Sequence, residues 1–142
     1  MNCNIKFSSA INSETIVKYG GVLFSKLDTA KVLDFHDVFI FGEKAKKKEC
    51  HKNAQCFCTE NDSFHVTHGW LVIDSRPTFN SIKFIAHSVV KSPEGKLLDV
   101  TPIETLDPRP FLPAFIDDKD FEDFANWLYQ NNLNGSFNYQ IT

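Results

Sequence analysis

The stretch Ser81–Thr101, SIKFIAHSVVKSPEGKLLDVT, predicts a β-hairpin. Apolar side chains recur along residues 81–91, and a shorter strand is expected over residues 96–101. Between them, the sequence Ser-Pro-Glu-Gly at 92–95 fits a type I turn with proline at its second position. The glycine can adopt the left-handed conformation of a bulge, which gives a three-residue loop and pairs Ser92 with Lys96.

This register would place two ionisable side chains on one face of the sheet. Asp99 lies opposite Val89, and His87 lies opposite Thr101. His87 and Asp99 are then diagonal neighbours with backbones roughly 7–8 Å apart, within reach of a hydrogen bond between imidazole and carboxylate. A loop one residue longer would put them on opposite faces. The turn chemistry favours the register that brings them together.

A helix is expected from Glu49 to the polar cluster at residues 59–62. Its apolar positions recur at the spacing of one helical face: Cys50, Ala54, Phe57 and Cys58. Cys50 would lie in the first turn, where unpaired backbone N–H groups and the helix dipole favour a thiolate. The positive charges of lysines 46–48 also favour the thiolate of Cys50. Because a thiolate is a strong nucleophile that a nearby imidazole can activate, Cys50, His87 and Asp99 form a candidate catalytic set.

The other segments complete an α+β prediction. Residues 64–74 predict a strand, and residues 117–131 predict a helix that Asp117 caps. A helix is also expected over residues 28–35, a turn at Gly20-Gly21, and an extended proline-rich segment from Pro102 to Pro113. We therefore expect residues 1–142 to form one domain with its core at 49–102. In it, an antiparallel sheet packs on the cysteine-bearing helix.

Composition excludes several classes of protein. The chain has 142 residues, a formal charge of −3, and 42% hydrophobic residues that include 14 phenylalanines. So many large apolar groups predict a folded chain, and no apolar run approaches the ~20 residues that cross a membrane. The acidic balance argues against nucleic-acid binding. The first residues lack the pattern of a secretory signal, so we expect a cytoplasmic protein, or one delivered by a route that needs no signal.

The cysteines leave a second kind of site open. Three of the four fall at 50, 56 and 58, which is unlike a disulfide framework and favours free thiols. Thiolates and imidazoles are also zinc ligands. The alternative zinc set lies within nineteen residues: Cys50, His51, Cys56, Cys58, His65 and His68. Against it, the spacing is irregular, and on a helix Cys56 and Cys58 point away from each other.

Four short motifs together resemble a pattern found in small, mostly uncharacterised bacterial domains. They are Cys-x-x-Asn-Ala at residues 50–54, Gly-Trp at 69–70, a His-led strand from residue 87, and Asp-x-Thr at 99–101. These domains are similar in layout to the papain-like and transglutaminase-like superfamily, which uses a Cys-His-Asp triad. The resemblance covers residues 50–102. Ser88 departs from it, because many members carry tryptophan after the histidine.

The resemblance implies a thiol-dependent acyl-transfer enzyme: a peptidase, deamidase, amidase or transglutaminase-like enzyme. Cys50 would be the nucleophile, His87 the general base and acid, and Asp99 the residue that orients His87. Asn53 would hold the loop, polarise a carbonyl or cap a backbone group, and Trp70 would either line the cleft or belong to the core.

The expected substrate is a protein or a small amide-containing molecule, and no cofactor is needed. The alternative is a non-catalytic domain of the same fold that binds a protein partner, for which the charged helix face around Asp118, Glu122 and Asp123 is a candidate surface.

Overall fold

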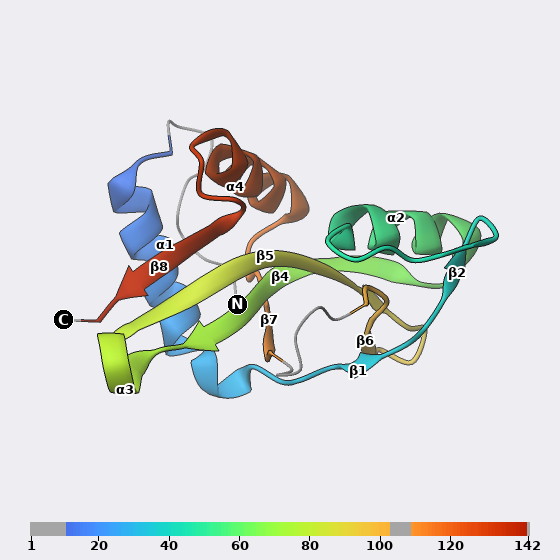
Figure 1. The fold of residues 1–142 in the computed structure, drawn as a ribbon, viewed down its shortest axis with the longest axis horizontal. Coiled ribbons are helices and arrows are strands. Elements are labelled where there is room, and N and C mark those ends of the chain that lie inside the picture. The colour runs from blue at the N-terminus through green and yellow to red at the C-terminus, as the bar shows by residue number, and fades with distance from the viewer. Residues whose placement is uncertain (1–10, 103–108, 142) are drawn as a thin grey trace.

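The computed structural model describes residues 11–102 and 109–141, apart from the side chain of Pro77, and shows a mixed α+β fold (Figure 1). Cys3 and residues 103–108 of the expected proline-rich segment lie outside the described residues. The helices are α1 (Ser13–Ser25), α2 (Cys50–Glu60), the short α3 (Arg76–Phe79) and α4 (Asp118–Gln130), with a 3₁₀ turn at Leu27–Thr29. No helix in this part of the chain is both long and apolar enough to cross a membrane.

The main sheet is built on two long strands, β4 (His65–Asp74) and β5 (Ser81–Lys91), which pair antiparallel along their length. The strand order is β1-β6-β5-β4-β7, and β8 also pairs with β5. The shorter strands are β1 (Asp34–Phe35), β6 (Leu97–Asp99), β7 (Phe111–Pro113) and β8 (Ser136–Gln140). A separate small hairpin joins β2 (Phe39–Ile40) to β3 (Glu43–Lys44).

The register predicted for the β5–β6 hairpin is confirmed. Val90 pairs with Leu98, and the Ser92 N–H donates to the Lys96 carbonyl at 2.8 Å. Gly95 has φ of +86°, the left-handed conformation that the turn requires and that glycine adopts without steric cost. Local turn chemistry therefore sets which residues of β5 and β6 share a face.

The outer edge of β5 changes partner in the middle of the strand. Residues 81–85 pair with β8, and residues 90–91 pair with β6. His87 lies between these two pairings, so the sheet has a gap in one edge at this residue. His87 also lines a pocket beside this gap.

Two apolar clusters hold the layers together. The larger one fills the space between the sheet, α1 and α4, and includes Tyr19, Trp70 and Phe124, all of which are fully buried. The smaller one lies beneath α2 and joins Ala54 to Val90 and neighbouring residues of β6. Figure 1 shows α2 above one end of the long β4–β5 pair and α4 above its middle.

Several expectations about individual elements are wrong. Residues 28–35 form the end of a 3₁₀ turn and then strand β1, not a helix, and β1 pairs parallel to β6, so the sheet is not wholly antiparallel. Gly20-Gly21 lies inside α1 rather than in a turn. A Cβ at Gly20 would come within 2.6 Å of the Tyr139 ring, so close packing against β8 accounts for a glycine in this helix. Residues 111–113, expected to be irregular, form β7.

Candidate active site

Cys50 is the first residue of α2, as the sequence predicts. No side chain in the described part of the chain caps the start of this helix, although most helices have such a cap. The first backbone N–H to bond within the helix is that of Asn53, to the Glu49 carbonyl at 2.7 Å. The N–H groups that precede it are therefore available beside the thiol.

His87 and Asp99 form the predicted pair. His87 Nε2 and Asp99 Oδ2 are 2.7 Å apart, and both side chains are mostly buried. The other carboxylate oxygen, Oδ1, accepts a hydrogen bond from the Thr101 N–H at 3.0 Å. Both Asp99 oxygens are thus engaged, which fixes the carboxylate and, through it, the ring of His87.

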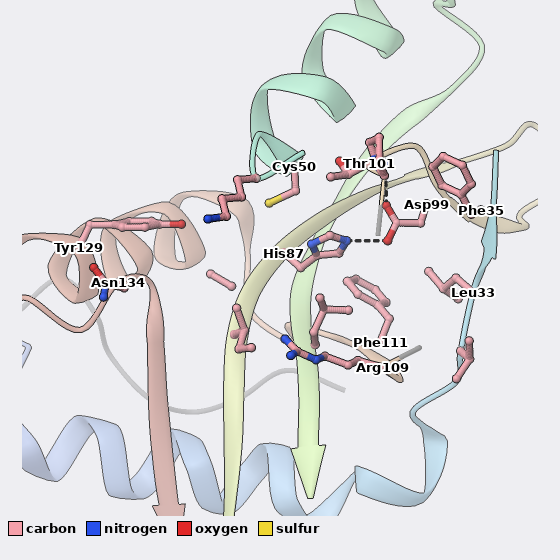
Figure 2. A pocket seen from close by; sticks show the side chains of 16 residues that line it. Leu33, Phe35, Cys50, His87, Asp99, Thr101, Arg109, Phe111, Tyr129 and Asn134 are labelled. Carbon is pink, nitrogen blue, oxygen red and sulfur yellow. Dashed lines mark hydrogen bonds and ion pairs between the residues drawn. The ribbon is translucent and has the colours of Figure 1, made fainter. Parts of the chain in front are cut away.

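The thiol of Cys50 lies on the opposite side of the His87 ring from Asp99, as Figure 2 shows. Burial alone would raise the pKa of Cys50, but the neighbouring imidazoles of His51 and His87 outweigh it and lower the pKa to about 6. Burial would likewise lower the pKa of His87, but the hydrogen bond to Asp99 and the thiolate of Cys50 raise it to about 9. Between these two pH values the favoured state is a thiolate–imidazolium pair.

The three side chains share one pocket of about 630 Å³. Its walls come from four parts of the chain: the segment before β2, the start of α2, the strands β4 to β7 with residues beside them, and the end of α4 with the turn after it. Phe111 of β7 lies beside the histidine, with ring centroids 6.2 Å apart. The pocket therefore offers space and an apolar wall next to the reactive group.

Asn53 ties the cysteine helix to the end of β6. It is 4% exposed, and its Nδ2 donates to the Lys46 carbonyl at 2.7 Å and to Thr101 Oγ1 at 3.0 Å. Two of the roles that the sequence suggested for Asn53 describe this geometry: it holds the loop before α2, and it caps a backbone carbonyl. The same Thr101 binds Asp99, so the Cys-x-x-Asn-Ala and Asp-x-Thr motifs meet in one hydrogen-bond network.

Trp70 does not line the pocket, which corrects its assignment as a supporting site residue. It is fully buried in the larger core, where its Nε1 donates to the Tyr19 hydroxyl at 2.8 Å. Tyr19 in turn donates to the Ala114 carbonyl at 2.7 Å. On β4 successive side chains point to opposite faces, and Trp70 is on the face that α1 and α4 cover.

The alternative zinc set is not brought together. Among residues 11–102 and 109–141, no three His, Cys, Asp or Glu side chains are placed to hold a metal ion. Cys56 and Cys58 are both on α2, where two residues correspond to a rotation of about 200° around the helix axis. Their thiols therefore face different surroundings, and burial raises the pKa of Cys58.

A pair of histidines behind the thiol, His51 and His68, was not expected from the sequence as part of the catalytic site. Ser88 is fully buried, and its Oγ bonds His51 Nδ1 at 2.5 Å and His68 Nδ1 at 2.7 Å. The His68 ring stacks on Phe121, 4.7 Å between centroids. Ser88 therefore anchors two histidines on the far face of β5, and one of them adjoins Cys50. The alternation of side chains along β5 could have predicted that Ser88 and His87 point to opposite faces of the sheet. It could not have predicted the partners of Ser88, because these come from α2 and β4.

The fold and the pocket together define a mixed α+β protein with a cysteine, a histidine and an aspartate in one cavity. Comparison with family models found no match, and neither a curated protein nor a solved structure matches the chain significantly.

Proposed function

We propose that the protein is a thiol-dependent acyl-transfer enzyme with a papain-like or transglutaminase-like core, in which Cys50 is the nucleophile. The observation that carries this proposal is the chain of contacts from the thiol through His87 to Asp99. A histidine placed between a cysteine and a buried carboxylate is the arrangement that activates a thiol for nucleophilic catalysis.

The two nitrogens of His87 have different roles in this proposal. In the neutral ring, Nε2 carries the proton and its N–H donates a hydrogen bond to Asp99, which leaves Nδ1 free to accept the thiol proton. Asp99 is itself held by the Thr101 N–H and stabilises the imidazolium that forms. His87 is thus the general base and acid, and Asp99 is a positioning residue.

The reaction begins when the Cys50 thiolate attacks the acyl carbon and a carbon–sulfur bond forms. The carbonyl oxygen becomes an oxyanion, which the free N–H groups at the start of α2 can stabilise. Protonated His87 gives its proton to the leaving amine as the carbon–nitrogen bond breaks. Water or an acceptor amine then attacks the thioester, His87 takes its proton, and the thiolate leaves.

A simple ester tests this chemistry without knowledge of the natural substrate. Incubation with p-nitrophenyl acetate should release nitrophenolate and leave an acetyl group on Cys50, detected by intact-protein mass spectrometry and peptide mapping. Cys50→Ala should form no such adduct, and Cys56→Ala is the matched control that should form it normally. Acetylation spread equally over the four cysteines would overturn the proposal.

A further inference from the structure

The pocket around Cys50 contains more positive charge than the acidic chain suggests. Among its described lining residues, Lys48 and Arg109 are cationic and Asp99 is the one carboxylate. Both oxygens of Asp99 are already bonded to His87 and to the Thr101 backbone. Among the described contacts, the Asp99 carboxylate therefore does not engage the guanidinium of Arg109.

The position of Arg109 is set by the backbone that follows it. The Pro110 carbonyl accepts from the Val72 N–H at 2.9 Å, and Phe111 exchanges two backbone hydrogen bonds with Lys31. Extended residues two apart point to the same side and lie roughly 7 Å apart. Arg109 therefore extends on the same side as Phe111, whose ring adjoins His87. Figure 2 shows the guanidinium turned into the pocket.

This guanidinium is half-buried, and within the described part of the chain no hydrogen bond or ion pair engages it. A partly desolvated guanidinium without a partner is unfavourable, and its planar set of donors matches a carboxylate. The neighbouring walls are apolar, with Leu33, Phe35 and Phe111 on the side of Asp99 (Figure 2). The pocket thus combines an anion-binding group with an apolar surface next to the nucleophile.

We infer that Arg109 is a specificity-determining residue that binds a carboxylate of the acyl substrate, with an apolar part of the same substrate packed beside Phe111. This inference rests on the proposed function and narrows its substrate class. The carboxylate has two sources, the C-terminus of a peptide or the side chain of an acidic residue, which share the same chemistry at Arg109.

Alkylating probes of matched shape test the inference. N-chloroacetyl-leucine carries a terminal carboxylate, N-chloroacetyl-leucinamide is its neutral counterpart, and N-chloroacetyl-glutamic acid α-amide carries the charge on a side chain. In each case the Cys50 sulfur displaces chloride and forms a thioether. We expect one or both acids to react about fivefold faster than the neutral amide. A factor of this size is typical of the attraction between one cation and one carboxylate when solvent partly screens it. The acid that reacts faster identifies the source of the carboxylate.

Three variants assign the preference to one side chain. Arg109→Gln should bring the acid-to-amide rate ratio close to one, and an unchanged melting temperature of this variant shows that the fold is intact. Arg109→Lys should retain part of the ratio. Lys52→Gln removes a cation from the exposed face of α2, two residues from Cys50 but outside the pocket, and should leave the ratio unchanged.

The outcomes separate this inference from the proposed function. A wild-type ratio at or below one, or a ratio that Arg109→Gln does not lower, would overturn the carboxylate site alone, provided that the neutral amide still labels Cys50 rapidly. Slow labelling by the neutral amide that His87→Ala does not change would overturn the proposed function and the inference with it.

Discussion

His87→Ala should strongly reduce the reactivity of Cys50 in mildly acidic solution. His87 is one of two imidazoles that lower the pKa of Cys50 to about 6 from its ordinary value of 9.0. Removing it leaves burial, which raises that pKa, opposed by His51 alone. The pKa should therefore move back toward the ordinary range, and less thiolate should be present below neutral pH.

The size of the effect depends on pH. At pH 5.5 a thiol with a pKa of about 6 is about one-quarter thiolate, whereas a thiol at its ordinary pKa is about 0.03% thiolate. The more acidic thiol is the weaker nucleophile, by ~20-fold over this difference in pKa. The net advantage is thus about 40-fold at pH 5.5 and only about fivefold at pH 7. Since His51 remains, we expect His87→Ala to slow alkylation at pH 5.5 by about 10- to 40-fold.

The assay is the rate of iodoacetamide labelling at Cys50 from pH 4.5 to 9.5, followed by peptide mass spectrometry. In the wild type the rate should rise through pH 6 to a plateau, because the thiol loses its proton there. Acyl transfer should in addition fall above pH 9, where His87 loses the proton that the leaving group needs.

Cys56 is an internal reference in this assay, and His65→Ala removes an exposed histidine of β4 as the matched control. A labelling rate at pH 5.5 that His87→Ala changes by less than twofold would refute the reasoning.

Four further variants test individual contacts. Asp99→Asn should keep the fold but hold His87 in the wrong tautomer. The rate of acyl transfer to water should therefore fall by ~10²–10⁴-fold, while the melting temperature changes little. A fall in this rate of less than threefold would argue against the positioning role of Asp99. Asn53→Ala removes two buried hydrogen bonds and should lower the free energy of unfolding by ~1–3 kcal/mol in urea titrations, and an unchanged midpoint would contradict this. Gly20→Ala should destabilise the protein, because the added Cβ would lie 2.6 Å from the Tyr139 ring. The added Cβ of Gly21→Ala has its nearest contact at 3.6 Å, so this variant should stabilise α1 by up to ~1 kcal/mol. Equal effects of the two variants in thermal denaturation would exclude the packing explanation.

Local chemistry explains why much of the fold could be predicted. The β5–β6 register follows from the turn at residues 92–95, and the start of α4 follows from Asp117, which accepts from the Asp120 N–H at 2.8 Å. Long-range packing explains the failures. Gly20-Gly21 resembles a turn until Tyr139 of β8 packs against it. The short β1 has an unexceptional sequence and exists as a strand because it pairs with β6.

The candidate site also contains residues that local sequence could place and residues that depend on long-range packing. Cys50, His87 and Asp99 could be placed together because a helix start and one hairpin position them. The surroundings could not be predicted, because they come from several segments: Arg109 from the residues just before β7, and the histidines at 51 and 68 from α2 and β4. Ser88 is an example, since its partners lie 37 and 20 residues away in sequence.

The most direct test of the central claim is the protonation state of the His87 ring in solution, measured by ¹⁵N NMR across pH. If thiol and imidazole share a proton as described, both ring nitrogens of His87 should be protonated at pH 7.5 and should titrate near pH 9, and Cys50→Ser should lower that pKa. A neutral His87 ring at pH 7.5, with a titration that Cys50→Ser leaves unchanged, would contradict the claim.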